Sequence, residues 1–474
     1  MTVLLGLGLV FTYLGSSLIL FPVLVRLMDP DEETARELFF ASLGLGPLTI
    51  AWLMTGLLTI VPGRSDLFYV GCIAAVFALL LFFAAGKIGI VGTIMKRSAA
   101  SLLALRARQH WTIWVLMAMI AVLAVRLFIL SASCPITEND ALQYSFVSKL
   151  MYERKALDFY PLITPDPATG FYAVSSHPPA YMGLMAWTYL IQGGASPAAW
   201  IKIISPMFVV YTLWLLAAIL SRRPRFVRLV GMLLLIATPH YFVEASNLSI
   251  DPLRIYAFTT AVFGVVWVLR ADHPRAAVAL GFAAGLSMFS HSLAGLLTLP
   301  ILSCIYLLRS RCAVRRRILS LAVLGVVALL IGGQQYLQNY RMFGTPIYDD
   351  LPVYRVEGIG QKEWIRQERN LVSLSDRLVH GFFMGFTRLQ MFALSYWLGA
   401  LGLAISFRRV WRDPDLFVFC STIALFYGVV LATLLVGTDA IVGSYRYVLT
   451  IQPFVACLGA VAIGRTHDAI VTAH

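Results

Sequence analysis

A short polar segment, Thr-Glu-Asn-Asp at residues 137–140, holds the first side chains that could do chemistry. It follows an apolar run at 111–132 and opens an amphipathic stretch. A carboxylate at a helix N-terminus stays ionised through the helix dipole, and an ionised carboxylate can act as a general base. Glu138 and Asp140 diverge on a helix, so we expect only one of them to be the base. The alternative is a capping box between Thr137 and Asp140.

A second acidic pair lies in a predicted external turn at residues 238–252. Asp251 precedes Pro252, which is typical of a helix start, and Arg254 one turn later can pair with it. A salt bridge there and a contact with substrate are both open interpretations. Glu244 has no such local explanation, and ionisable residues at membrane depth are functional by default.

Cations on the same side of the membrane could neutralise a phosphate group. The candidates are His291, Arg341, Arg388, Arg446 and, within apolar runs, Arg126 and Lys202. Arg446, in Ser-Tyr-Arg-Tyr at the mouth of the last apolar run, is the strongest of them. The alternative for Arg446 is a side chain that snorkels to the lipid headgroups. His291 is weaker because an imidazole can be neutral near pH 7.

The composition is that of a membrane protein. The chain is 59% hydrophobic and 13% charged, whereas a soluble domain carries about 25% charged residues. A spanning helix needs about 20 apolar residues, and the sequence predicts an all-α polytopic fold with about 13 spans. They lie near 3–27, 43–62, 67–86, 111–132, 197–220, 227–244, 252–270, 276–290, 292–308, 317–333, 389–407, 415–437 and 446–464.

The basic residues orient these spans. The net charge of +13 gathers in short loops between the apolar runs, which is the positive-inside pattern and argues against nucleic acid as a partner. Placing these loops in the cytoplasm puts four segments outside: 133–196, 245–251, 334–388 and 438–445. The run at 177–194 then cannot cross, and we expect a helix lying at the outer interface. The alternative is a true span with one misread neighbour.

Three further segments bear on the site. Residues 276–308 are expected to form two short helices with His291 at the outer turn between them. Residues 28–42 carry five carboxylates and are expected to be a solvated helical connector without chemistry. Tyr144 belongs to an aromatic-rich first external loop, whose rings form either an interfacial belt or a surface for stacking sugars.

Several motifs, taken in order, resemble those of the GT-C membrane glycosyltransferases, in the branch with protein O-mannosyltransferases and aminoarabinose transferases. Asp140 to Tyr144 is similar to the acidic start of the family's first external loop, and Ser176-His177-Pro178-Pro179 to its His/Lys-Pro-Pro motif. Residues 239–251 resemble its second external turn. Residues 339–348 resemble its Arg-Asn-x-x-Phe-Gly-x-Pro-x-Tyr segment, and Arg446-Tyr447 with the later Pro453 its final helix. Many members have Thr-Lys where this chain has Ser290-His291.

The resemblance implies a multi-pass glycosyltransferase of a bacterial inner or plasma membrane, with its site on the extracytoplasmic side. The implied donor is a polyprenyl-phosphate-linked sugar, and the acceptor is a hydroxyl of a glycan, lipid or protein. Transfer would invert the anomeric centre, with Asp140 as base and with Glu138 and Glu244 as the other candidates. The implied substrate-binding residues are Tyr144, His177, Asp251, His291, Arg341, Arg446 and Tyr447.

We divide the chain into four parts on this basis. They are an N-terminal three-helix extension (1–110), a catalytic transmembrane module (111–333) with the first external loop at 133–196, a second external loop (334–388) and C-terminal helices (389–474).

No nucleotide-binding, metal-binding or hydrolase motif is found, so we expect no cofactor. The competing class is a transporter or flippase of lipid-linked sugars, but no clear internal repeat typical of transporters is found.

Overall fold

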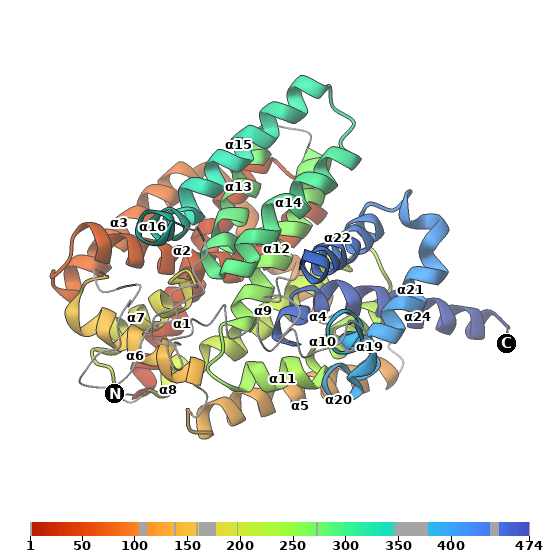
Figure 1. Ribbon diagram of the computed structural model, residues 1–474, viewed down its shortest axis with the longest axis horizontal. Helices are drawn as coiled ribbons and strands as arrows, with labels where there is room; N and C mark the ends of the chain where they lie inside the picture. The colour runs from red at the N-terminus through yellow and green to blue at the C-terminus, as the bar shows by residue number, and fades with distance from the viewer. Residues whose placement is uncertain are drawn as a thin grey trace.

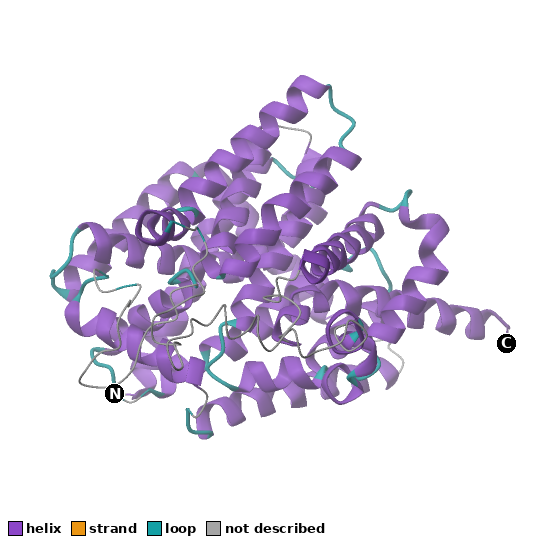
Figure 2. Ribbon diagram, viewed as in Figure 1, coloured by secondary structure: helices purple, strands orange, loops and turns teal. Residues whose placement is uncertain are grey.

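The computed structural model describes most of the chain, and in that part every regular element is a helix (Figure 2). This confirms the predicted all-α class. The described residues are 2–103, 111–136, 139–157, 160, 177–196, 198–271, 274–344, 346, 378–436 and 445–473.

The longer helices make up the bundle shown in Figure 1. They are α1 (Thr2–Met28), α2 (Glu32–Ile60), α3 (Asp66–Phe83), α4 (Ile88–Leu103), α5 (Trp111–Ser133), α6 (Asn139–Arg154), α7 (Ala180–Gln192), α9 (Ile204–Ile219), α10 (Arg225–Ile236), α12 (Asp251–Ala271), α13 (Pro274–Ser290), α14 (Ser292–Arg309), α15 (Val314–Gly332), α16 (Gln334–Phe343), α21 (Ser395–Val410), α22 (Pro414–Val436) and α24 (Gln452–Ala473). The short helices are α8 (Ala199–Lys202), α11 (Pro239–Ser246), α19 (Met384–Thr387), α20 (Leu389–Phe392) and α23 (Tyr445–Val448).

The number of spans differs from the predicted thirteen. Within the described residues, nine helices are long and apolar enough to cross a membrane, and eleven do so if each of two bent pairs counts as one span. The pairs are α10 with α11, bent by 63°, and α15 with the first part of α16, bent by 67°. The other two predicted spans correspond to α13, with 17 residues, and α21, with 16. Both are shorter than the roughly 20 residues that a perpendicular span needs.

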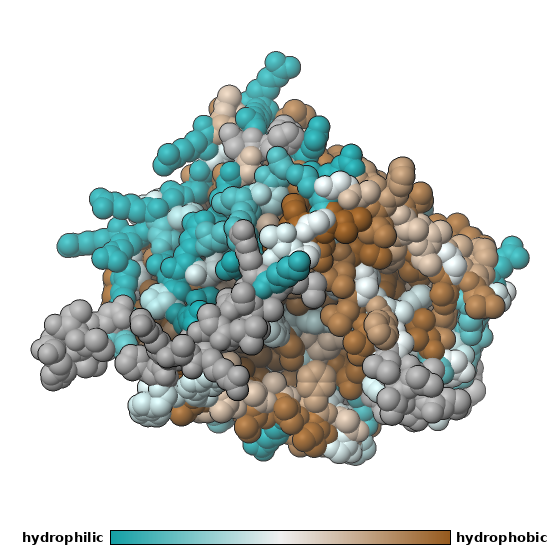
Figure 3. Space-filling model, turned by 180° about the vertical axis from the view of Figure 1, so that it is seen from behind, coloured by the Kyte–Doolittle hydropathy of each residue, from teal (hydrophilic) through white to brown (hydrophobic). Residues whose placement is uncertain are grey.

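Helix α12 is the centre of the bundle, and nearly all of its side chains are buried. It packs against α2, α9, α13, α14 and α22, which surround it in Figure 1. The face shown in Figure 3 carries hydrophilic side chains toward one side and hydrophobic side chains over much of the other. An apolar surface of this kind on a bundle with a filled core is what lipid contact requires. Since α12 is enclosed, its two ends can hold charged groups away from lipid.

The two N-terminal helices are part of this packed bundle. The Tyr13 hydroxyl of α1 lies 2.8 Å from the Thr188 hydroxyl of α7. Glu37 of α2, in the segment expected to be solvated and without chemistry, is 1% exposed. Its Oε2 atom accepts hydrogen bonds of 2.8 Å from both Trp267 Nε1 and Arg270 Nη1 of α12. The expectation of a solvated connector is therefore wrong for Glu37, because the segment is the first turns of α2 and one face of it is buried.

Helix α7 corrects a second expectation. Its 13 residues are too few to cross a membrane, which agrees with the predicted non-crossing segment. However, it does not lie on the surface at the interface: its side chains from Ala180 to Leu190 are all buried, against α1, α2 and α6. The apolar pattern of residues 177–194 reflects burial within protein, which periodicity cannot distinguish from burial in lipid.

Helices α13 and α15 cross closely because both carry glycine at the contact. A Cβ atom on Gly285 would lie 2.9 Å from the Ala328 carbonyl oxygen and 2.6 Å from Ile331 Cβ. A Cβ atom on Gly332 would lie 2.3 Å from the Gly285 carbonyl oxygen. Small residues of this kind allow membrane helices to approach backbone to backbone. The contact fixes the end of α13 and thereby the turn that carries His291.

Candidate active site

Four of the charged residues singled out in the sequence, Asp140, Glu244, Asp251 and Arg446, come from three separate segments and meet at the Arg446 guanidinium. Its Nη1 atom lies 2.6 Å from Asp140 Oδ2, and its Nε atom lies 2.6 Å from Asp251 Oδ2. Glu244 Oε2 is 3.6 Å from the same Nε atom. Arg254 completes the group, since its Nη2 atom is 2.7 Å from Asp251 Oδ1 and donates to the Arg446 carbonyl oxygen. We call these five residues the carboxylate–arginine cluster.

Each member is presented by the end of a helix or by a short helix. Asp140 lies in the first turn of α6, Asp251 begins α12, and Arg446 is in the four-residue α23. Glu244 comes from α11, where the bend of the α10–α11 pair turns it inward. Ser249 shapes the turn before α12, because its hydroxyl contacts both Asp251 N and Asp251 Oδ2 at 3.2 Å.

The side chains of the cluster differ in how far solvent reaches them. Asp140 is 37% exposed, whereas Asp251 is 1% and Glu244 is 6% exposed. Buried charges persist in proteins only when they are paired, and Asp251 is paired with both arginines. Asp140 is therefore the carboxylate of the cluster that a substrate can reach.

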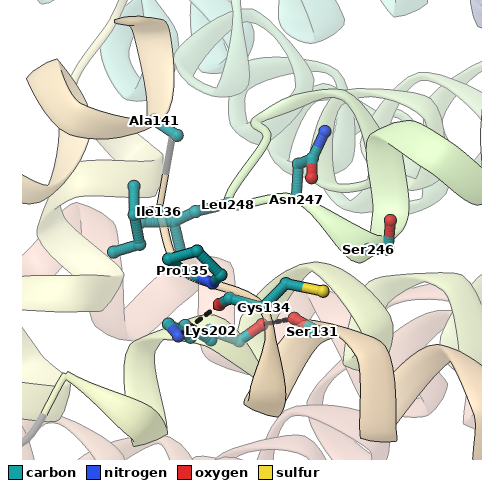
Figure 4. Close-up of a pocket in the computed structure, with 9 residues that line it drawn as sticks. All are labelled: Ser131, Cys134, Pro135, Ile136, Ala141, Lys202, Ser246, Asn247 and Leu248. Carbon is teal, nitrogen blue, oxygen red and sulfur yellow. Dashed lines mark hydrogen bonds between the residues drawn. The ribbon is translucent and has the colours of Figure 1, made fainter. Parts of the chain in front are cut away.

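Contacts beside α6 hold the segment that leads to Asp140. Lys202 Nζ donates a 2.6 Å hydrogen bond to the Cys134 carbonyl oxygen, and Ser131 Oγ donates one of the same length to the Lys202 carbonyl oxygen. Figure 4 shows these bonds beside Leu248 from the turn before α12. The cavity at this point is about 10 Å³, which is room for about one water molecule. It is part of the support for Asp140 and not a substrate pocket.

Two histidines lie beside the cluster. The ring centroids of His177 and His291 are 4.1 Å apart, and His177 Nδ1 is 3.3 Å from the Ser292 hydroxyl. Burial lowers the pKa of both imidazoles, and the neighbouring ring lowers the pKa of His291 further. His291 Nδ1 accepts from the Leu293 backbone N–H at 3.0 Å. In neutral His291 the proton is therefore on Nε2, and the side chain is a hydrogen-bond donor without positive charge.

Aromatic rings enclose the same space. The Tyr447 ring is 6.1 Å from the His291 ring, and the Arg254 guanidinium lies 5.4 Å from the Tyr447 centroid. Tyr144 is buried beside His177, at 6.4 Å between centroids. Its hydroxyl is buried and has no hydrogen-bond partner among the described residues. Tyr144 thus lines the interior of the protein, which differs from an interfacial belt.

The remaining predicted residues are not brought to the cluster. Arg341 is exposed on α16 and makes no described contact with the cluster. Glu138 lies outside the described residues, as does Thr137 of the suggested capping box.

The contacts of Arg446 differ from those of a side chain that snorkels to lipid headgroups. Its guanidinium is held by the carboxylates of Asp140 and Asp251 within the protein. No group of three or more His, Cys, Asp or Glu suited to a metal is found among the described residues.

Tyr160 and Ser292 support the histidine pair, and neither is predicted as a site residue from the sequence. The Tyr160 hydroxyl donates to the His177 carbonyl oxygen, and Ser292 contacts the His177 ring. Only the aromatic content of the first external loop pointed to Tyr160. Nothing in the sequence distinguishes Ser292 from other serines at helix starts.

Residues 176–332 match the family described as dolichyl-phosphate-mannose-protein mannosyltransferase. The matched region includes His177, Glu244, Asp251 and His291. This match confirms the predicted resemblance to GT-C membrane glycosyltransferases. No curated protein matches the chain in sequence.

Among solved structures, the crystal structure of ArnT from Cupriavidus metallidurans bound to undecaprenyl phosphate is similar. The sequence identity is 17% and the TM-score is 0.46, over 76% of this chain and 63% of that chain. The similar region thus spans less than two thirds of that chain's length.

Proposed function

We propose that the protein transfers a sugar from a polyprenyl-phosphate donor to an acceptor hydroxyl on the extracytoplasmic side of the membrane. The observation that carries this proposal is the half-exposed carboxylate of Asp140, held 2.6 Å from Arg446 at the edge of a largely buried charge cluster. The matched family's name, which refers to a dolichyl-phosphate mannose donor, supports a lipid-phosphate donor. The proposed site is within a bundle with enough apolar helices to lie in a bilayer.

In the proposed reaction, Asp140 takes the proton of the acceptor hydroxyl as the oxygen attacks the anomeric carbon. The new bond is between the acceptor oxygen and that carbon. The bond from that carbon to the phosphate oxygen breaks, and its electron pair leaves with the polyprenyl phosphate. A single displacement of this kind inverts the anomeric configuration. The negative charge that develops on the phosphate is the charge that nearby donors must stabilise.

Arg446 is the proposed phosphate ligand, with assistance from neutral donors. Its Nη1 atom is bound to Asp140, so an incoming phosphate oxygen would compete with that carboxylate for the same guanidinium. His291 Nε2–H and the Tyr144 hydroxyl are hydrogen-bond donors beside the cluster. Neutral donors lower the cost of holding a phosphate in a buried site without adding charge.

The proposal is tested with Asp140→Asn, which keeps the shape of the side chain and removes the base. We expect transfer to fall about 100- to 10,000-fold, while the thermal unfolding midpoint in detergent changes little because Arg446 keeps Asp251. A matched control is Asp66→Asn, since Asp66 is 40% exposed and paired with Lys155. Transfer within a few-fold of the wild type would show that Asp140 only pairs with Arg446.

The assay also separates an enzyme from a transporter or flippase. Proteoliposomes receive polyprenyl-phosphate mannose labelled in the phosphate, together with a membrane extract as the acceptor source, and free labelled polyprenyl phosphate is measured. A transferase releases it only when acceptor is present. The proposed transfer would be contradicted, and a transporter favoured, if intact donor moves between leaflets and no free polyprenyl phosphate is released with any donor sugar of a panel.

A further inference from the structure

The turn between α13 and α14 fixes the direction of the His291 ring. His291 is the N-cap residue of α14, and its Nδ1 atom accepts a 3.0 Å hydrogen bond from the Leu293 backbone N–H. An N-cap side chain bonded in this way is tied to the first turn of its helix. In neutral His291 the remaining donor is Nε2–H. A contact that holds the turn therefore also sets where this donor lies.

The Tyr336 hydroxyl of α16 is bonded to this turn. It donates a 3.0 Å hydrogen bond to the Met288 carbonyl oxygen, and the His291 carbonyl oxygen lies 3.3 Å from it. Met288 is in the last turn of α13, where the carbonyl groups have no partner within the helix. One phenol thus joins the end of α13 to the residue that caps α14.

A glycine in the first turn of α14 gives the phenol access to these carbonyl groups. A Cβ atom on Gly295 would lie 1.9 Å from the Tyr336 hydroxyl oxygen and 2.6 Å from Tyr336 Cζ. Carbon atoms in van der Waals contact are about 3.5–4.0 Å apart, so a larger residue at this position would displace the phenol from the turn. The contact can therefore be broken from either helix, by changing Tyr336 or Gly295.

Helix α16 turns its polar side toward the protein. Gln335 and Asn339 are 5% and 1% exposed, whereas Leu337 and Tyr340 are 51% and 59% exposed. A surface helix usually buries its apolar side instead. The reversed pattern indicates that hydrogen bonds, rather than apolar packing, hold α16 against its neighbours.

The same helix is bonded to the segment of the second histidine. Gln338 Nε2 donates a 3.0 Å hydrogen bond to the Tyr160 carbonyl oxygen, and the Tyr160 hydroxyl donates to the His177 carbonyl oxygen. His177 and His291 come from separate segments of the chain, yet their ring centroids are 4.1 Å apart. Helix α16 thus contacts the backbone of one histidine directly and the backbone of the other through Tyr160.

We propose that α16 positions the histidine pair, with Tyr336 as the positioning residue of His291. In this proposal Tyr336 does not touch substrate, and it acts by keeping the turn in the place that directs His291 Nε2–H into the site. A displacement of about 1 Å in a site can lower a rate about 100-fold, so a hydroxyl outside the site can matter to it. The inference rests on the proposed function in one respect only, which is the role of His291 as a hydrogen-bond donor to the lipid phosphate.

The positioning is tested first without lipid or transfer, by NMR of detergent-purified protein labelled with ¹³C in the histidine rings. The chain has eight histidines, and the signal of His291 is identified by its loss in H291A. The variants are Y336F and the control Y340F, which removes the hydroxyl of an exposed tyrosine one turn later in α16. We expect the His291 signal to shift in Y336F and to stay in place in Y340F. The variant G295A, which excludes the phenol from the side of α14, should also shift the signal and replaces Y336F if that variant does not fold.

Binding of polyprenyl phosphate then tests whether the position of His291 matters to the proposed site. We expect H291A to bind at least about 10-fold more weakly than wild type, since a hydrogen bond to a charged group is lost. Y336F should bind about 3- to 10-fold more weakly. The double variant Y336F/H291A should bind no more weakly than H291A, because Tyr336 acts through His291. A general loss of structure would instead multiply the two effects.

The outcomes separate this inference from the proposed function. An unchanged His291 signal in Y336F and G295A, or an equal shift in Y340F, would overturn the positioning by α16. So would a double variant that binds more weakly than H291A by the full factor of Y336F. If H291A binds as tightly as wild type, the proposed contact of His291 with the phosphate is refuted, whereas a shifted signal in Y336F alone still supports the positioning of the pair.

Discussion

Replacing Arg446 should weaken both the fold and the binding of the donor phosphate. Arg446→Ala leaves Asp251 and Glu244, which are 1% and 6% exposed, without their shared cation. Removing one partner of a buried ion pair costs about 3–5 kcal/mol. The value here should be near the lower end, because Arg254 still pairs with Asp251 at 2.7 Å. We therefore expect a loss of about 3 kcal/mol in the free energy of unfolding.

The effect on binding follows from the same contacts. Losing a desolvated charge contact costs about 2–5 kcal/mol, so the Kd for polyprenyl phosphate should rise at least about 30-fold. Arg446→Lys should recover part of this, because it keeps the charge. A single ammonium cannot replace the separate Nη1 and Nε contacts to Asp140 and Asp251.

The assay is a pair of measurements on protein purified in detergent. The thermal unfolding midpoint reports the fold, and titration with polyprenyl phosphate reports binding by those variants that remain folded at the assay temperature. Arg126→Ala is the control, since Arg126 is an exposed arginine on α5 outside the cluster. A folded Arg446→Lys variant that binds polyprenyl phosphate as tightly as Arg126→Ala and wild type would refute the guanidinium of Arg446 as the phosphate ligand. A similar unfolding midpoint for all variants would refute the charge-burial argument.

Three other features can be tested by substitution. Glu37→Gln should lower the free energy of unfolding by about 1–3 kcal/mol because it removes charge from a buried pair. The control Glu33→Gln, in a half-exposed pair, should lower it by under about 1 kcal/mol. Equal shifts of the thermal unfolding midpoint in the two variants would show that the Glu37 pair adds nothing to stability. Gly285→Ala should cost about 1–3 kcal/mol from overpacking, but Gly325→Ala, with open space around its Cβ position, should be tolerated in the same melt. A single cysteine in place of Ser196, in a background without native cysteines, should react with an impermeant maleimide in intact cells. Reaction only after permeabilisation would reverse the proposed orientation.

The fold class followed from composition because a chain that is 13% charged cannot provide a soluble surface of this size. The exact spans did not follow. Helix α13 and helix α21 are apolar but short, and whether a short helix crosses depends on its tilt and neighbours. Helix α7 shows the same limit from another direction, since its apolar residues contact protein on all sides.

The individual charged groups of the site could be proposed from the sequence, because each is a polar residue at the end of an apolar run. Asp140, Glu244, Asp251 and Arg446 were all singled out for that reason. Their meeting at one arginine depends on how α6, α11, α12 and α23 pack, and no local pattern encodes that. Likewise, nothing near Glu37 in the sequence indicates that Arg270, more than two hundred residues later, is its partner.

The charge balance of the cluster links donor binding to the state of the proposed base. Three carboxylates and two arginines give a net charge of −1 when all are ionised, so an anionic donor would meet no free cation there. A phosphate can reach Arg446 only by replacing one of its carboxylate partners. Asp251 and Glu244 are buried, and leaving either unpaired is costly. Asp140 is half-exposed and can leave at lower cost than either of them. In the proposed reaction, the phosphate would therefore take the place of the carboxylate that must then accept the hydroxyl proton.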